Sequence, residues 1–181
     1  MDEIKTLIRK KYKNFRNAIT SAEKTQFDSK IIESLLPIVS DSNKISIYFP
    51  IQSEIDLLPL FKILANKILF PRIESNILSF VSPSNLSSDF EYNPKYKIYE
   101  PRRKNLTFIP EIIICPMLSF DKNKNRLGYG GGFYDRTIAL LRKKHKIKFI
   151  GVAYDIQEHL SLPTSSQDQR LDIIVTPNRI L

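Results

Sequence analysis

The chain has 181 residues, a hydrophobic fraction of 42% and a charged fraction of 26%, which are ordinary values for one globular domain. No apolar run approaches the ~20 residues of a membrane-spanning helix, and no apolar segment of a secretory signal follows the charged N-terminus. One cysteine excludes an intramolecular disulfide, and two histidines beside it leave few ligands for a four-ligand zinc site. We therefore expect one domain over residues 1–181, in the cytoplasm.

The net charge of +9 has three explanations: a nucleic-acid surface, attraction of a small anionic substrate, or a lysine-rich composition with solvated side chains. The basic residues are spread along the chain, with modest clusters at 5–16 and 142–148. Aromatic residues do not alternate with them as they do in proteins that bind single strands. This distribution favours a small-molecule partner, with no nucleic acid and no membrane.

Two helices are predicted over the first forty residues. An apolar stripe with helical spacing defines the first of them. The stripe comprises Ile4, Leu7, Ile8, Tyr12, Phe15 and Ile19. Thr20 followed by Glu23 fits a capping box, so a second helix is expected from there to about Leu36, with Pro37 marking its end.

Strand and helix patterns alternate along the rest of the chain. Predicted strands cover residues 44–49, 68–70, 77–81, 111–115, 148–154 and 172–176, and predicted helices cover 56–67 and 133–144. The stretch 82–105 is rich in Ser, Asn, Pro and Tyr, and we expect it to be irregular with little core. This alternation predicts an α/β domain with a mainly parallel sheet.

The single cysteine and the two histidines suggest no catalytic role. Cys115 lies in the apolar run 111–115, where cysteine behaves as a small buried hydrophobe. A nucleophilic role for it would need a histidine in a recognisable motif. His145 and His159 stand in polar surroundings without one.

A glycine cluster is the most informative feature of the chain. Four of the five glycines are Gly128, Gly130, Gly131 and Gly132. Glycines let backbone N–H groups approach a ligand closely, and a helix start adds a positive dipole end that suits phosphate. The cluster follows the strand predicted over 111–115 and precedes the helix predicted from Phe133, which places it at the carboxyl edge of the sheet, where ligands of open α/β folds bind.

Two simpler interpretations of the glycine cluster fit less well. A flexible connector would not need the aromatic and charged residues that surround these glycines. The cluster lacks the Gly-Lys-Ser/Thr of a Walker A loop and the downstream acid of a dinucleotide fingerprint. The residues alone therefore predict a loop that binds an anion at a helix start.

The run NRLGYGGGFYDR at 125–136, preceded by PMLSFD at 116–121, resembles the signature of the 5-formyltetrahydrofolate cyclo-ligase family. The resemblance covers nearly the whole chain. It implies a three-layer α/β domain, similar to the ribose-isomerase and CoA-transferase group. It also implies an enzyme that uses ATP and Mg²⁺ to convert 5-formyltetrahydrofolate to 5,10-methenyltetrahydrofolate, releasing ADP and phosphate. The formyl oxygen is phosphorylated and the ring closes, without a protein nucleophile.

The same resemblance implies the ligand contacts. ATP is expected at Lys5, Arg9, Arg126, Leu127, Gly128, Tyr129, Gly130, Gly131, Gly132, Phe133 and Tyr134. The folate is expected at Phe49, Glu54, Tyr129, Gly130, Gly131, Gly132 and Phe133. Mg²⁺ is expected at Asp135 and Asp172, since this ion takes one or two carboxylates beside phosphate oxygens and water.

Most of these assignments have a structural alternative. Lys5 and Arg9, four apart on one helix face, could be part of a solvated basic surface. Phe49 could belong to the core, and Asp135 could complement a helix dipole. Arg72, which follows a predicted strand, could hold phosphate or the glutamate tail of the substrate, or lie on the surface.

The chain departs from the family pattern at two positions of the loop. Gly131 stands where lysine is frequent, and Phe133 where tyrosine is frequent. Two rival functions stay open: a sugar-phosphate isomerase on a similar fold, and a basic nucleic-acid-binding module. We expect folate and ATP as partners, and a monomer or weak homodimer.

Overall fold

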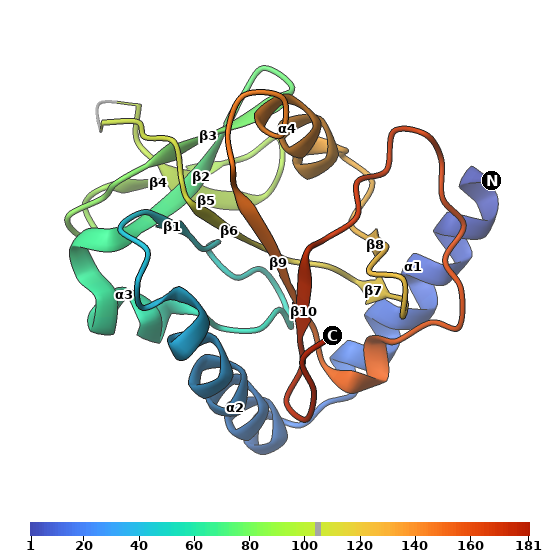
Figure 1. Ribbon diagram of the computed structural model, residues 1–181. Coiled ribbons are helices and arrows are strands. Elements are labelled where there is room, and N and C mark those ends of the chain that lie inside the picture. Colours follow the sequence, from blue (N-terminus) through green and yellow to red (C-terminus); the bar gives the residue numbers. More distant parts are fainter. Residues whose placement is uncertain (104–105) are drawn as a thin grey trace.

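A six-stranded sheet forms the centre of the computed structural model, which describes residues 1–103 and 106–181 (Figure 1). In spatial order the strands are β10 (Ile173–Val175), β9 (Lys148–Val152), β6 (Ile112–Cys115), β1 (Ile45–Ser46), β2 (Ile68–Glu74) and β3 (Ile77–Val81). The first five are mutually parallel, and β3 is antiparallel to β2. The predicted mainly parallel sheet is confirmed.

The strand order creates a switch point beside β1. From β1 the chain moves to one side to form β2, and it later returns to the other side of β1 to form β6. The connections that leave β1 and β6 therefore diverge at the carboxyl ends of these strands. In open α/β sheets this divergence leaves a crevice that receives ligands.

The helices form the outer layers. They are α1 (Asp2–Asn17), α2 (Ser21–Val39), α3 (Leu58–Leu64) and α4 (Phe133–Leu141), with short 3₁₀ turns η1 (Ala65–Lys67) and η2 (Asp155–Gln157). Figure 1 shows α2 and α3 on one side of the sheet and α4 on the other. Accordingly, Ile112 and Ile114 of β6 pack in the core with α2, whereas Ile113 and Cys115 pack with α4. The predicted three layers are confirmed.

The start of α2 follows the predicted capping box. The Thr20 hydroxyl accepts the Glu23 N–H at 3.3 Å, and the Glu23 carboxylate accepts the Thr20 N–H at 2.9 Å. The predicted end is wrong by a few residues, because Pro37 lies inside the helix, which continues to Val39.

The apolar stripe predicted for α1 is partly wrong. Ile4 and Leu7 are 54% and 66% exposed. The buried face instead consists of Lys5, Ile8, Tyr12 and Arg16. Ile8 and Tyr12 pack against Leu127 and Leu162, beside the site described below, and the two basic residues complete this face. Hydrophobic periodicity cannot identify a buried helix face when some of the buried residues on it are charged.

The remaining strands form two small antiparallel pairs. They are β4 (Phe90–Asn93) with β5 (Ile98–Pro101), and β7 (Ser119–Phe120) with β8 (Arg126–Leu127). The expectation of an irregular stretch at 82–105 is therefore wrong over the β4–β5 hairpin, in which Phe90 and Glu100 are buried. Positions 104 and 105 of that stretch lie outside the described residues.

Other differences concern the ends of elements. The strand predicted over 44–49 is shorter in the structure, as β1. Ile47 still donates its N–H to the Leu69 carbonyl at 3.0 Å, and the chain then leaves the sheet and lines a cavity. The strand predicted over 68–70 continues to Glu74, because its second half pairs with β3. In the part of the chain that the structure describes, no helix is long and apolar enough to cross a membrane.

Candidate functional site

A cavity of about 1230 Å³ opens at the carboxyl edge of the sheet. Its walls are the segment that follows β1, the glycine loop with the start of α4, the N-terminal part of α1, the β4–β5 hairpin and residues 165–169. Segments from the whole length of the chain therefore meet at the switch point. The cavity is large enough for more than one small ligand.

The glycine loop adopts a conformation that requires glycine at two positions. Gly130 has a φ of 104° and Gly132 a φ of 67°, in the left-handed region. Gly132 is also the N-cap of α4, so the loop ends where the helix begins, as predicted. A Cβ on Gly131 would lie 2.8 Å from the Phe133 ring, so a side chain there would require that ring to shift. The loop thus presents bare backbone to the cavity.

The structure places Lys5 and Arg9 beside this loop. Arg9 Nε donates to the Gly128 carbonyl at 2.9 Å, and a Cβ on Gly130 would lie 3.4 Å from the Arg9 guanidinium carbon. Lys5 Nζ forms an ion pair of 2.5 Å with Asp168. Both basic residues line the cavity. The first turns of α1 therefore place two cationic side chains at the end of the cavity that the glycine loop lines, one of them paired with Asp168.

Arg16 is a site residue that sequence reasoning missed. It is only 2% exposed, and its guanidinium contacts three distant segments. Nε donates to Ser53 Oγ at 3.0 Å, Nη1 to the Met117 carbonyl at 3.3 Å, and Nη2 to the Tyr129 hydroxyl. Its separation of seven residues from Arg9 places both on one face of α1, and this spacing was the available signal.

Glu54 shares a hydrogen-bond chain with Arg16, and both of these charged residues are buried. The Tyr129 hydroxyl accepts from Arg16 and donates to the Glu54 carboxylate. Glu54 Oε2 also accepts the Ile51 N–H at 2.9 Å. Burial raises the pKa of Glu54 from 4.5 to about 7, although the Ile51 hydrogen bond and the Arg16 charge oppose the shift. The cavity wall therefore carries a carboxyl group that titrates near neutral pH.

Asp135 and Arg126 form a second charged pair at the start of α4. Arg126 Nη2 donates to Asp135 Oδ1 at 2.9 Å, and the Gln169 N–H donates to the same oxygen at 3.0 Å. The Arg126 guanidinium also lies 5.6 Å from the centre of the Tyr134 ring. Its Nε is buried and, among the described residues, has no hydrogen-bond partner. Buried donors are normally satisfied, so this nitrogen is an exception among the described residues.

The structure does not bring Asp172 together with Asp135. Asp172 accepts the Phe149 N–H at 2.7 Å and a hydrogen bond from Arg142 at 3.2 Å, and it does not line the cavity. It precedes β10, whose amino end lies at the edge of the parallel sheet opposite the cavity. Within 1–103 and 106–181, no three His, Cys, Asp or Glu side chains form a group that could hold a metal ion.

The far wall of the cavity is aromatic. The Phe49 ring lies 5.3 Å from Phe90 and 5.5 Å from Tyr99, so Phe49 both lines the cavity and packs on the hairpin. At the tip of the hairpin, the Tyr96 ring lies 5.2 Å from Phe133 of the glycine segment. The hairpin thus spans the cavity from the end of β1 to the start of α4.

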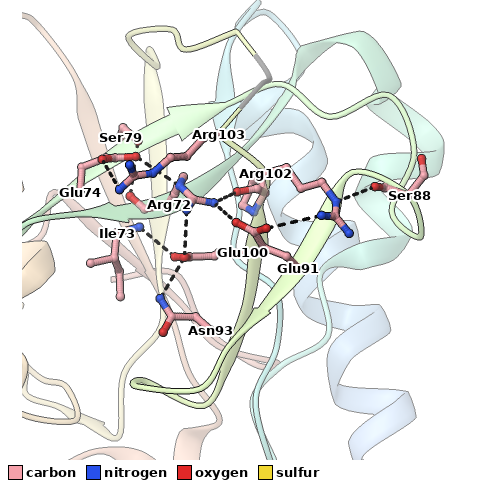
Figure 2. Close-up of polar contacts among 11 residues, drawn as sticks. Arg72, Ile73, Glu74, Ser79, Ser88, Glu91, Asn93, Glu100, Arg102 and Arg103 are labelled. Carbon is pink, nitrogen blue, oxygen red and sulfur yellow. Dashed lines mark hydrogen bonds and ion pairs between the residues drawn. The ribbon is translucent and has the colours of Figure 1, made fainter.

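Arg72 neither lies on the surface nor lines the cavity. It is 7% exposed and is surrounded by the carboxylates of Glu74, Glu91 and Glu100 (Figure 2). With all three acidic neighbours in place, this guanidinium is engaged within the protein. The sequence suggested that Arg72 binds an anion or lies on the surface, and in this structure it does neither.

Cys115 is fully buried in the core against α4. Burial raises the pKa of its thiol to about 12, so the thiolate is scarce at neutral pH. This supports the prediction that Cys115 packs rather than reacts.

The fold and the cavity define a doubly wound α/β protein with a glycine-rich loop at its switch point. The sequence profile of the 5-formyltetrahydrofolate cyclo-ligase family matches residues 1–177, and the chain belongs to that family. The chain is similar to the 5-formyltetrahydrofolate cyclo-ligase of Mycoplasma pneumoniae, with 31% identity over 178 residues that cover 94% of this chain and 97% of that protein. The Escherichia coli protein of the same name is 28% identical over 180 residues, covering 91% and 96%.

Solved structures agree with this assignment. The 5,10-methenyltetrahydrofolate synthetase of Aquifex aeolicus superposes with a TM-score of 0.83 at 29% identity, covering 98% of this chain and 91% of that one. The synthetase of Mycoplasma pneumoniae superposes with a TM-score of 0.76 at 24% identity, covering 96% and 98%, and so shares the fold. The predictions of this family, and of an enzyme, are confirmed.

Proposed function

We propose that this protein uses ATP to close the ring of 5-formyltetrahydrofolate, forming 5,10-methenyltetrahydrofolate, ADP and phosphate. Membership of the cyclo-ligase family supports the reaction. The observation that carries the proposal is one cavity whose walls include both the glycine loop at the start of α4 and the buried Glu54. An anion-binding end and a polar, aromatic end lie in the same cavity, as a reaction between a nucleotide and a folate requires.

The anion-binding end is suited to the phosphates of ATP. Backbone N–H groups near a helix start, with Lys5 and Arg9 beside them, hold negative charge without a covalent intermediate on the protein. The formyl oxygen is a poor leaving group until it carries the γ-phosphoryl group of ATP. The neighbouring folate nitrogen, which is not yet part of a ring, then attacks the formyl carbon, and phosphate leaves as the ring closes. The residues act by positioning and charge stabilisation.

The other end is suited to the folate. The Glu54 carboxylate can accept hydrogen bonds from the donor-rich pterin, and its position is set by Tyr129 and Ile51. Phe49 and Phe133, which both line the cavity, offer flat apolar surfaces. We propose that the pterin binds between these groups, with its formyl group toward the glycine loop.

Asp135 has the chemistry of a Mg²⁺ ligand. Both hydrogen bonds that the described residues donate to it go to Oδ1, which leaves Oδ2 for a cation. One carboxylate is adequate, because Mg²⁺ takes most of its other ligands from phosphate oxygens and water. When bound, the ion would neutralise the charge that develops on the phosphates. The proposed site therefore rests on Asp135, since Asp172 lies at the opposite edge of the sheet and accepts the Phe149 N–H.

Absorbance of the methenyl product tests the proposal. Purified protein with 5-formyltetrahydrofolate, ATP and Mg²⁺ should generate this signal, and omission of ATP should abolish it. Turnover of a sugar phosphate without ATP would favour the isomerase alternative. Binding to DNA or RNA that weakens steeply with salt, without ligase activity, would favour the nucleic-acid alternative.

Replacement of Asp135 tests the proposed metal role. Asp135→Asn keeps the shape and an acceptor for Arg126 but removes the charge, so we expect a loss of about 100-fold or more in kcat at saturating ATP. Raising the Mg²⁺ concentration should restore part of this loss. Activity that is independent of Mg²⁺ in both proteins would contradict the assignment. Asp172→Asn, remote from the cavity, is the matched control and should retain activity.

A further inference from the structure

Among the described residues, neither strand of the β4–β5 hairpin pairs with a strand of the main sheet. β2 pairs with β1 at Ile68 and Leu69 and with β3 over its second half, after β1 has left the sheet. The two strands of the hairpin pair with each other, and β5 lies beside β2. Side chains therefore have to replace the backbone ladder that would otherwise fix its position.

The Glu100 carboxylate replaces one of these ladder bonds. Its Oε2 accepts the Ile73 N–H of β2 at 3.0 Å, as a neighbouring strand would. Its Oε1 accepts from Asn93 of the paired strand β4 at 2.9 Å and lies 3.6 Å from Arg72 Nη2. Glu100 is buried, so this carboxylate depends on these partners for its stability.

Arg72 completes the attachment from the side of β2 (Figure 2). Its Nη1 donates to Glu91 of β4 at 2.8 Å and to the carbonyl of Pro101 in β5. Its Nε donates to Glu74 of β2 at 3.2 Å. One planar guanidinium thus ties β2 to both strands of the hairpin, a task for which the fixed fork of arginine is suited.

The opposite face of this hairpin forms a wall of the cavity. Tyr99, beside Glu100, packs on Phe49, and Tyr96 at the tip packs on Phe133. Strand residues alternate between the two faces, so the side chain of Glu100 is directed to the ion cluster while that of Tyr99 meets Phe49. The ion pairs of Arg72 with the glutamates around it therefore fix where Tyr96 and Tyr99 stand in the cavity wall.

We infer that Arg72 is a positioning residue for folate binding: it holds the β4–β5 hairpin at the distance from Phe49 and Phe133 that the folate requires. This inference rests on the proposed function. The ATP end of the cavity is built from α1 and the glycine loop, which Arg72 does not contact. Loss of Arg72 should therefore weaken the binding of the folate and leave the binding of ATP unchanged.

Kinetics of Arg72→Met test the inference. The KM for 5-formyltetrahydrofolate should rise about 10-fold or more, because misplacing a wall by about 1 Å is costly. The KM for ATP should stay within about two-fold. Arg72→Lys keeps the charge but not the fork, so it should raise the same KM to a smaller extent. Arg102→Met, with a half-exposed side chain and a 3.5 Å ion pair to Glu91, is the matched control and should behave as the unmodified protein.

Hydrogen exchange of the hairpin gives a readout that does not depend on turnover. In Arg72→Met, amides of residues 90–101 should exchange faster, while those of β6 and β9 should be unchanged. An unchanged folate KM, equal increases in both KM values, or unaltered exchange at 90–101 would overturn the inference. If Arg72→Met does not fold, Arg72→Lys carries the same comparisons. A protein without ATP-dependent turnover would defeat the proposed function, whereas the exchange experiment would still decide whether Arg72 positions the hairpin.

Discussion

Arg16 and Glu54 are charged groups whose partners lie far away in the sequence. Tyr129 connects them, and Met117 and Ser53 complete the donor and acceptor pairing of the Arg16 guanidinium. Buried groups of this kind are stable only when their hydrogen bonds are satisfied. Replacing Arg16 or Glu54 should therefore change the free energy of unfolding as well as the cavity wall.

Removing Arg16 should destabilise the protein. Arg16→Met removes the donor to the Tyr129 hydroxyl and one of the two donors to the buried Met117 carbonyl, which keeps its 2.9 Å hydrogen bond from Gln157. We expect this loss to cost about 1–3 kcal/mol in the free energy of unfolding. Urea unfolding followed by far-UV circular dichroism measures this cost. Lys10→Met, on the exposed face of the same helix, should change the free energy by less than about 0.5 kcal/mol. Equal effects of the two substitutions would contradict the role assigned to Arg16.

Glu54 should make stability depend on pH. Burial raises its pKa from 4.5 to about 7, so the folded protein retains a proton that the unfolded chain releases between these values. The free energy of unfolding should therefore fall as the pH rises from about 4.5 to about 7, by on the order of 3 kcal/mol, and level off above that. Glu54→Gln should lack this contribution. Urea unfolding of both proteins at pH 5 and pH 8 measures the difference, and identical pH dependence would refute the assignment.

At the scale of elements, the junction between the glycine loop and α4 depends on backbone conformation. Gly132 caps the helix with a φ of 67°, and a Cβ there would lie 2.4 Å from Arg136 Nη1. Arg136 itself donates to the carbonyls of Asn76 and Gly131, so it holds the loop against the turn between β2 and β3.

Gly132→Ala should disturb this junction. The left-handed backbone and the displaced Arg136 should lower the free energy of unfolding by about 1–2 kcal/mol, as thermal unfolding would show. Gly128→Ala is the matched control, since its Cβ would meet its nearest neighbour, Arg126 Nη1, at an ordinary 3.8 Å. Its effect should stay below about 0.5 kcal/mol. If the two alanines are equally tolerated, the glycine requirement at the helix start is refuted.

At the scale of the whole molecule, the cavity joins distant parts of the chain. The same cavity is lined by α1, by the hairpin and by residues 165–169, and strands from both halves of the chain alternate in one sheet. We therefore expect one cooperative unfolding transition, with the cavity lost together with the core.

Ligand binding should raise the stability of this whole unit. ATP at a hundred times its Kd should add about 2.7 kcal/mol, which for a domain of this size corresponds to an increase of about 5–10 °C in Tm. The chain contains no tryptophan, so calorimetry is the suitable measurement. Adenosine, which lacks the phosphates, should give a much smaller increase. Equal shifts with adenosine and ATP would refute binding through the phosphates.

Local sequence predicted the elements whose formation depends on neighbouring residues. The capping box at Thr20 and Glu23, the apolar strand β6 and the start of α4 at Phe133 agree with the structure. The β4–β5 hairpin could not be recognised in this way. The face of the hairpin that contacts β2 is stabilised by the ion pair of Arg72 with Glu100, and not by alternating apolar side chains.

By itself, the sequence determined that this is an α/β protein with a glycine loop at a helix start, because both follow from contacts within a few residues. Its resemblance to the cyclo-ligase signature identified the family. Only the tertiary structure decided that Arg16 supports Glu54, that Arg72 anchors the hairpin, and that Asp172 lies away from Asp135. The physical reason is that buried charges are stabilised by partners from distant segments, and the chain order does not reveal which segments meet.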